Sequence, residues 1–169
     1  PGARATRAGG HFVCTDEKTG MQALERIHPT KPSRPGLVER IEFEYERHGV
    51  LCLTANFRVV TGRVLTPTIE ETRTKQQFVE HVARTIATDP HGEWIFVVDN
   101  LDTHTSEELI RFVVAQTGDV TPLGTFSKDG VLQNRASRRA FLADPSHRIR
   151  FVYTPRHCSW LNQVELWFS

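Results

Sequence analysis

The chain has 169 residues, of which 38% are hydrophobic, and this is enough for one buried core rather than two. Lys and Arg total 21 against 20 Asp and Glu, so any affinity for nucleic acid must come from local basic patches. The three cysteines are isolated and no apolar run approaches the roughly 20 residues of a membrane span, which excludes a disulfide framework, a thiolate zinc site and a transmembrane helix.

The first predicted elements are two strands joined by an irregular segment. Residues 11–20 open with an apolar strand that ends near Asp16, and a Pro-rich, basic connector follows over residues 28–36. Residues 39–49 alternate apolar and acidic side chains, and this period of two indicates a strand with one face in water. We expect the connector to lie on the surface.

Strand patterns then give way to helical spacing. Residues 50–66 contain two strand-like runs with a turn at positions 61 and 62. Residues 72–88 predict an amphipathic helix, and Thr74 with Gln77 has the spacing of a capping box at its start. The apolar face of this helix comprises Phe78, Val79, Val82 and Ile86.

The second half of the chain alternates strands with helices. Residues 93–100 form a nearly continuous apolar run, which is typical of a strand covered on both faces. Thr105 and Glu108 then offer a second capping box at the start of a helix. Residues 148–155 predict a further buried strand, and residues 159–169 begin another helix.

Residues 117–147 show a weaker pattern, rich in Gly, Lys, Arg and Ser, with one short helix predicted over residues 135–142. We interpret this segment as an insertion in a single domain that spans residues 1–169. The order of elements predicts an α/β fold in which helices flank a mixed sheet. We expect this domain to be soluble and cytoplasmic.

Three acidic residues are candidates for a metal site. Asp16 and Asp99 each follow an apolar run, and ligands collect beyond the carboxyl ends of strands in such sheets. Glu165 falls near the edge of the apolar face of the last predicted helix. Carboxylates that are brought together repel each other unless a cation lies between them, so we expect two Mg²⁺ or Mn²⁺ ions of the kind that assist phosphodiester cleavage.

The segments FVCTDEKTG, VVDNLDTH and YTPRHCSWLNQVELWF occur in this order. They resemble the three acidic blocks of DDE-type transposases, in particular the bacterial insertion-sequence branch of the mariner-like superfamily. An Asp-Asn pair followed by a His matches residues 99–104, and a Leu-Asn-x-x-Glu signature matches residues 161–165. The resemblance covers nearly the whole chain, from residue 11 to residue 169.

This resemblance implies an RNase H-like fold with Asp16, Asp99 and Glu165 as the catalytic and metal-binding triad. It implies hydrolysis of double-stranded DNA at the transposon ends, followed by attack of the freed 3′ hydroxyl on target DNA. The resemblance also implies that no covalent enzyme intermediate forms. The residues implied to support the active site are Asn100, His104 and Asn162.

Two features depart from the pattern of the family. The interval from Asp99 to Glu165 is longer than is usual in the mariner-like group, and the excess can be placed in residues 117–147. Family members usually carry N-terminal helix-turn-helix domains, which the sequence lacks, so we expect a catalytic fragment or a truncated copy. The full-length protein is expected to be a homodimer associated with the nucleoid, and residues 28–36 are a candidate dimer contact.

Each candidate residue also has a simpler interpretation. An Asp at the end of a strand is commonly a turn residue or a helix cap. His104 could cap or pack against the helix that follows it, and Asn162 could be a residue that starts a helix. The neighbouring acids Glu17 and Asp102 compete for the metal role, and we interpret them as supporting or solvated groups.

Basic residues in the two irregular segments are candidates for DNA binding, although a run of charge is commonly just a solvated surface. Trp160 and Trp167 are interpreted as core residues rather than as platforms for stacked bases. The candidate DNA-binding residues are Lys31, Arg34, Lys128, Arg135, Arg138 and Arg139.

Two rival functions remain open. A metal-dependent nuclease or resolvase on an RNase H-like fold would share the acidic site but would cut DNA without joining the ends. An inactive DNA-binding remnant would keep the same residues without turnover. Strand transfer separates the first rival from a transposase, and metal-dependent cleavage separates the second.

Overall fold

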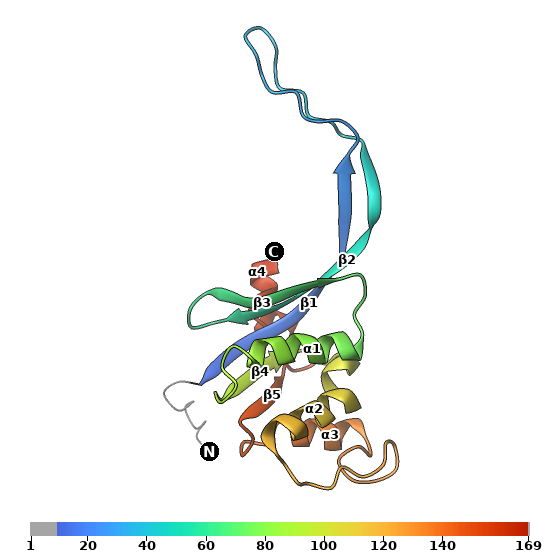
Figure 1. Cartoon of the computed structure of the whole chain (residues 1–169), viewed down its shortest axis with the longest axis vertical. Helices are drawn as coiled ribbons and strands as arrows, with labels where there is room; N and C mark the ends of the chain where they lie inside the picture. Colours follow the sequence, from blue (N-terminus) through green and yellow to red (C-terminus); the bar gives the residue numbers. More distant parts are fainter. Residues whose placement is uncertain (1–9, 169) are drawn as a thin grey trace.

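The computed structural model describes residues 10–168, so residues 1–9 and 169 of the predicted domain lie outside the described range (Figure 1). The strands are β1 (His11–Arg26), β2 (Tyr45–Arg58), β3 (Arg63–Glu70), β4 (Trp94–Val98) and β5 (Ile149–Tyr153). The helices are α1 (Lys75–Ile86), α2 (Glu107–Thr117), α3 (Arg135–Leu142) and α4 (Val164–Phe168). Two 3-10 turns, η1 (Asp102–Thr105) and η2 (Ser159–Leu161), precede α2 and α4.

The strands form one five-stranded sheet in the order β3-β2-β1-β4-β5. β1, β2 and β3 pair antiparallel, whereas β4 runs parallel to β1 and β5 runs parallel to β4. The predicted fold class is confirmed, because this mixed sheet with flanking helices is the RNase H-like arrangement. No helix within residues 10–168 is both long enough and apolar enough to cross a membrane.

Helices pack on both faces of the sheet (Figure 1). Because side chains alternate across a strand, Val13 of β1 faces the larger core under α1, α2 and α3, and Cys14 faces the smaller core under α4. The larger core includes Val13, Phe78, Phe96, Leu109, Leu142 and Phe151. The smaller core consists of Cys14, Ala55, Val97 and Val164, with partly buried residues around it.

The helices follow local sequence signals closely. α1 begins after the capping box that Thr74 and Gln77 were predicted to form, and its four predicted apolar residues are buried. α3 has the bounds predicted for it. The predicted cap of α2 is wrong, because Ser106 rather than Thr105 accepts the hydrogen bond from the backbone N–H of Leu109. Thr105 instead closes the 3-10 turn η1.

β1 does not end near Asp16 as predicted but continues to Arg26. Its parallel pairing with β4 stops at the pair Cys14 and Val97, and beyond this pair its partner is β2 alone. Asp16 therefore lies inside a strand, just past the parallel part of the sheet. The apolar pattern failed to predict the extension because most of these side chains lie in water.

Beyond this point β1 and β2 leave the body of the molecule as a protruding arm, which we define as residues 19–50 (Figure 1). Residues 31–40 are all exposed, which confirms the surface position of the connector. Arg34 and Leu37 exchange backbone hydrogen bonds around a tight turn at the tip. Gly36 occupies the turn position that requires a positive φ, here 81°.

Two expectations about apolar side chains are wrong. The strand predicted over residues 39–49 with one buried face begins only at Tyr45. Ile41 and Phe43 are 55% and 81% exposed because no part of the body within residues 10–168 covers the arm. Trp160 and Trp167, predicted to be core residues, are 68% and 47% exposed. The short helix α4 buries Val164 instead.

Candidate active site

Asp16 and Asp99 stand on neighbouring strands at the same level of the sheet. The last parallel pair of β1 and β4 is Cys14 and Val97, and each acid follows its member of that pair at the same interval along the chain. Neighbouring strands lie about 4.8 Å apart, so the register directs both acids to one edge of the sheet. Asp99 lies just past the end of β4, whereas Asp16 lies within β1.

Asp16 is a nearly buried carboxyl group, 8% exposed. Its Oδ1 accepts a hydrogen bond of 2.8 Å from the backbone N–H of Glu17. Burial raises the pKa of Asp16 to about 7. Repulsion from three nearby acids also raises this pKa, and the two effects together outweigh the hydrogen bond from Glu17, which lowers it. These acids are Asp99, Glu17 and Glu165. The two other members of the predicted triad therefore lie close enough to Asp16 for their charges to act on it.

His104 is fully buried between two acids. Its Nε2 lies 3.2 Å from Oε1 of Glu17, and its Nδ1 lies 2.8 Å from Oδ1 of Asp99. The Nδ1 contact is poorly aligned as a hydrogen bond, so it is an ion pair between the imidazolium and the carboxylate. Burial alone would lower the pKa of His104, but its contacts with Asp99 and Glu17 outweigh burial and raise that pKa to about 9.

Asp99 differs from Asp16 in its electrostatic surroundings. Burial alone would raise the pKa of Asp99, but His104, the backbone N–H of Leu101 and the charge of Arg73 together lower it below its usual value. The hydrogen bond from Leu101 N to Asp99 Oδ1 measures 2.8 Å. Asp99 is therefore ionised at neutral pH, whereas Asp16, when no cation is near, holds a proton below about pH 7.

Asn162 connects the helix that carries Glu165 to the strand that carries Asp16. Its side chain is completely buried, and Nδ2 donates a hydrogen bond of 2.8 Å to the carbonyl oxygen of Thr15. Its own backbone carbonyl oxygen accepts a hydrogen bond of 3.0 Å from the backbone N–H of Glu165, which is half-buried. Asn162 therefore fixes the start of α4 against β1.

Asn100 fixes the loop that follows Asp99. Its Nδ2 donates to the carbonyl oxygen of Thr154 at 2.7 Å, and its Oδ1 accepts from Arg139 at 2.7 Å. The guanidinium of Arg135 donates to the backbone carbonyl of Asn100. These contacts join the loop to the residue that follows β5 and to α3.

Three of the predicted DNA-binding arginines are engaged within the protein. Arg135 pairs with Asp102 at 3.0 Å, in addition to its contact with Asn100. Arg138 donates to the carbonyl oxygen of Thr105 at 2.7 Å, and the guanidinium of Arg139 lies 4.2 Å from the ring centroid of Tyr153. To bind any of these three arginines, a DNA phosphate would have to compete with these contacts within the protein. The other three candidates, Lys31, Arg34 and Lys128, are exposed.

Sequence reasoning missed two basic residues that lie beside Asp99. A shallow pocket of about 260 Å³ is lined by Asp99, by the loop after β4 and by the loop after β5, which contributes Arg156 and His157. Both residues are exposed, and His157 has a left-handed backbone with a φ of 60°. The only sequence signal was a pair of basic side chains after Pro155, which is too common to interpret.

The donor chemistry of the acidic site suits a hard divalent cation, because carboxylate oxygens are the ligands that Mg²⁺ prefers. Within residues 10–168, however, no three His, Cys, Asp or Glu side chains are grouped closely enough to hold a metal ion as they stand. The metal-binding roles of Asp16, Asp99 and Glu165 therefore remain predictions, and a bound cation would have to draw the carboxylates together.

Comparison with protein families matches residues 11–169 to the family described as DDE superfamily endonuclease. The match runs from the start of β1 through the whole of α4. No curated protein matches the chain.

Proposed function

Because the chain belongs to the DDE superfamily of endonucleases, we propose that it is the catalytic domain of a transposase from the bacterial insertion-sequence branch of the mariner-like superfamily. It cleaves DNA strands at transposon ends and joins the freed 3′ ends to target DNA, in the bacterial cytoplasm at the nucleoid. The observation that carries this proposal is the buried carboxyl of Asp16, whose pKa is raised by burial and by the charges of Asp99 and Glu165. Acidic side chains whose charges act on one another are the kind of ligands that a phosphodiester-cleaving metal site uses.

Asp16, Asp99 and Glu165 are the residues that would hold two Mg²⁺ or Mn²⁺ ions. When bound, such ions activate the attacking oxygen and stabilise the leaving oxygen of a phosphodiester. The chain itself supplies the placement of the three acids. Asp16 sits on the sheet, Asn162 fixes the helix of Glu165, and the loop after Asp99 is held by contacts with Thr154, just past β5, and with α3.

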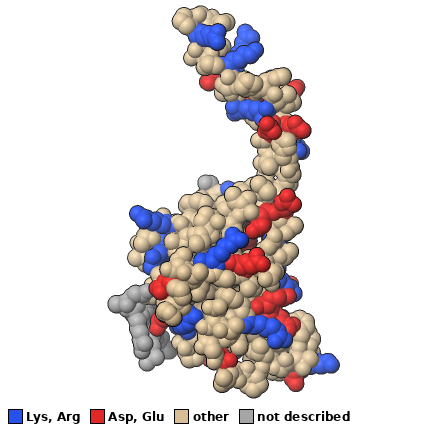
Figure 2. All heavy atoms as spheres, viewed as in Figure 1, with Lys and Arg blue, Asp and Glu red and all other residues tan. Residues whose placement is uncertain are grey.

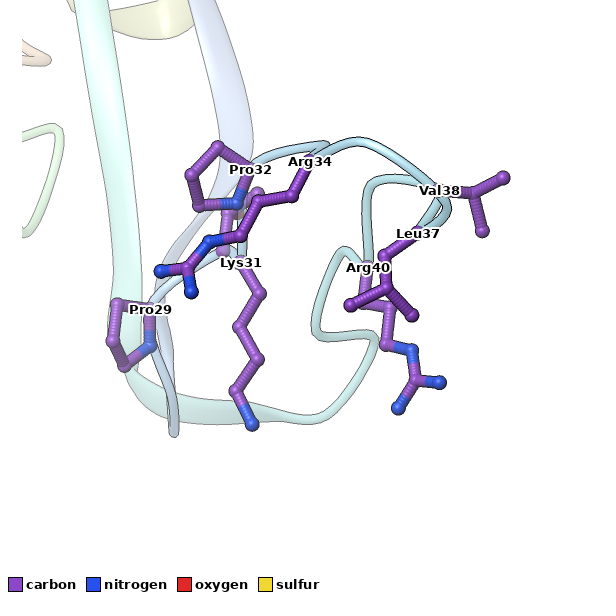
Figure 3. Close-up of a pocket in the computed structure, with 8 residues that line it drawn as sticks. Pro29, Lys31, Pro32, Arg34, Leu37, Val38 and Arg40 are labelled. Carbon is purple, nitrogen blue, oxygen red and sulfur yellow. The ribbon is translucent and has the colours of Figure 1, made fainter.

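The arm supplies a basic surface for double-stranded DNA. A pocket of about 420 Å³ lies at its tip, away from the proposed triad, and Lys31, Arg34 and Arg40 are among the residues that line it (Figure 3). Lys and Arg side chains gather at this end of the molecule (Figure 2). Because the net charge is only +1, such a local group of cations is the part of the chain suited to neutralise phosphates. Lys128 is a further exposed candidate.

The arm also supports the proposal of a homodimer for the full-length protein. Its apolar side chains are exposed although they alternate as in a buried strand, and exposed apolar groups that lie close together commonly mark an interface. The most exposed of them are Leu37, Val38, Ile41 and Phe43. A partner subunit would cover surface that the body of this chain leaves bare.

The second candidate function is an inactive DNA-binding remnant. It is favoured by one observation, which is that no three metal-ligating side chains within residues 10–168 are grouped for a metal ion. A nuclease or resolvase without strand transfer has the same acids and is distinguished by its products. Mg²⁺-dependent joining of a labelled 3′ end to plasmid DNA supports the transposase, and cleavage without joining supports the nuclease.

The test of the catalytic proposal compares Asp99→Asn with Asp102→Asn. Both changes remove one negative charge from the same loop, but the side chain of Asp102 is 86% exposed and pairs with Arg135. We expect Mn²⁺-dependent nicking of a labelled DNA duplex to fall to background in the Asp99 variant and to persist in the Asp102 variant. Equal activity of the two variants would contradict the assignment, as would loss confined to Asp102→Asn.

A further inference from the structure

Glu17 is an acid that the proposed triad does not use. It follows Asp16 on β1, and successive side chains of a strand point to opposite faces of the sheet. The carboxylate of Glu17 therefore enters the side covered by α1 and α2, where its side chain is only 4% exposed. Burying a carboxylate is costly unless it is paired, and the partner of Glu17 is His104, with 3.2 Å between Oε1 and Nε2.

His104 is held from several sides in addition to Glu17. Its ring lies 4.4 Å from the ring of Phe78, measured between centroids, and its backbone carbonyl accepts a hydrogen bond of 2.8 Å from the hydroxyl of Tyr153. The ring is completely buried. A ring packed this tightly cannot turn freely, so its Nδ1 presents a fixed positive group to Oδ1 of Asp99 at 2.8 Å.

We propose that Glu17 is a positioning residue, which acts through His104 to fix the orientation of the Asp99 carboxylate for metal binding. The inference rests on the proposed function, because it assumes that Asp99 is a metal ligand. β1 then supplies two adjacent acids with different tasks. Asp16 would bind the cation, and Glu17, whose side chain lies on the other face of the sheet, would act through His104 to orient the acid on the neighbouring strand.

The contacts of Asp99 explain why such orientation is needed. Its negative charge and that of Asp16 on the neighbouring strand repel each other. Both contacts that hold it, from His104 Nδ1 and from the backbone N–H of Leu101, use Oδ1. This leaves Oδ2 for a cation. Partners that orient a metal ligand in this way typically account for about 10- to 100-fold in metal affinity.

The chain offers a matched control on the same strand. Glu25 of β1 contacts His48 of β2, with 2.8 Å between Oε2 and Nε2, so the residue types and the kind of contact are the same. This pair lies in the arm, where the side chain of Glu25 is 70% exposed and that of His48 is 46% exposed. It does not touch the acidic site.

The experiment measures the dissociation constant of Mn²⁺ at pH 8 by electron paramagnetic resonance, together with the unfolding midpoint of each protein. We expect Glu17→Leu to weaken Mn²⁺ binding by about tenfold or more. Glu17→Gln keeps an oxygen that can accept from His104 and should lose less affinity. Glu25→Leu should bind Mn²⁺ as the unaltered chain does. A purely structural role would lower the unfolding midpoint and leave the affinity of the folded protein unchanged.

Folded Glu17→Leu with unaltered Mn²⁺ affinity overturns the inference, and so does an equal loss in Glu25→Leu. If Glu17→Leu does not fold, Glu17→Gln decides, and unaltered affinity in that variant overturns the inference. Asp99→Asn separates this failure from failure of the proposed function. If Asp99→Asn binds Mn²⁺ as the unaltered chain does, or if the unaltered chain binds none, the metal site itself is wrong and both proposals fall.

Discussion

Asp16 and Asp99 are chemically identical side chains that the fold treats in opposite ways. Burial and neighbouring acids raise the pKa of Asp16, whereas the contacts with His104 and Leu101 lower the pKa of Asp99. The sequence could single out both residues as candidates, because each belongs to a recognisable acidic block. It could not predict the difference between them, because that depends on how β2, η1 and α4 pack around each carboxyl group.

Replacing Asp16 by Asn should stabilise the protein in the presence of a chelator at pH 7.5. The pKa of Asp16 is about 7 in the folded state against a usual 3.8, so the metal-free protein loses stability as the pH rises between these values. The full shift corresponds to about 4 kcal/mol, which is an upper bound for the gain in free energy of unfolding.

Urea unfolding of Asp16→Asn and the unaltered protein, each with EDTA at pH 7.5 and at pH 4, measures this gain. At pH 4 Asp16 is protonated in the folded state, so the gain should largely disappear. Added Mn²⁺ should stabilise the unaltered protein at pH 7.5 but not the variant. A variant less stable than the unaltered protein in EDTA at pH 7.5 would show that the ionised carboxylate of Asp16 does not destabilise the metal-free protein.

At the scale of elements, the sequence predicted what is encoded locally. The capping box of α1, its apolar face and the bounds of α3 all depend on residues within a few positions of one another. The cap of α2 was missed by one residue because Thr105 and Ser106 can both cap a helix. The choice is made by η1, the turn that contains His104, and this turn packs against α1 through the contact between His104 and Phe78, which the local sequence does not encode.

α1 is joined to the sheet through a buried polar network. His81 is 1% exposed, its Nε2 lies 2.7 Å from Nδ2 of Asn56, and its Nδ1 lies 3.0 Å from the hydroxyl of Thr68. Asn56 Nδ2 can only donate, so Nε2 accepts and Nδ1 carries the proton that is donated to Thr68. Burial, with a smaller effect of the charge of Arg84, lowers the pKa of His81 to about 4.

This network predicts a loss of stability in mild acid. The pKa of His81 is near 6.5 in the unfolded chain and about 4 in the folded protein, so the unfolded state binds more protons between these values. The contribution of neutral His81 to the free energy of unfolding is complete above pH 6.5. It is lost as the pH falls toward 4, by about 3 kcal/mol in total. Urea unfolding from pH 7 to pH 4.5 should show a shallower decline in His81→Gln. Parallel declines in the two proteins would contradict the assignment.

At the scale of the whole molecule, the chain divides into a packed body and an arm. The sequence predicted the surface connector but not the arm, because alternating apolar residues such as Ile41 and Phe43 normally indicate a buried strand face. That rule assumes that other parts of the same chain pack over the apolar face of the strand. In the described residues no body element covers the arm, so its pattern reflects either a partner surface or a length of hairpin that water surrounds.

Shortening the arm tests whether its tip serves DNA binding or the stability of the body. Arg26 and Tyr45 are register partners, so an Asn-Gly pair that replaces residues 27–44 closes a two-residue hairpin at a position where the strands already pair. We expect the free energy of unfolding to change by no more than about 0.5 kcal/mol, because the removed residues are almost all exposed. Binding to a labelled duplex, measured by fluorescence anisotropy across a range of NaCl concentrations, should weaken. The slope of log K against log salt should decrease by about 0.9 for each phosphate that the shortened protein no longer neutralises.

The double variant Lys31→Ala, Arg34→Ala in the intact arm should reproduce most of that change in slope, since it removes the charges and keeps the hairpin. Lys128→Ala, a single exposed charge on the body, provides the comparison for a cation outside the arm. An unaltered slope in the shortened protein would show that the tip does not bind phosphates. Unfolding of the shortened protein would show instead that the arm belongs to the cooperative core, contrary to the exposure of residues 31–40. A shortened protein that keeps its stability and has a weaker salt dependence would show that the arm is a DNA-binding element carried by a body that folds without it.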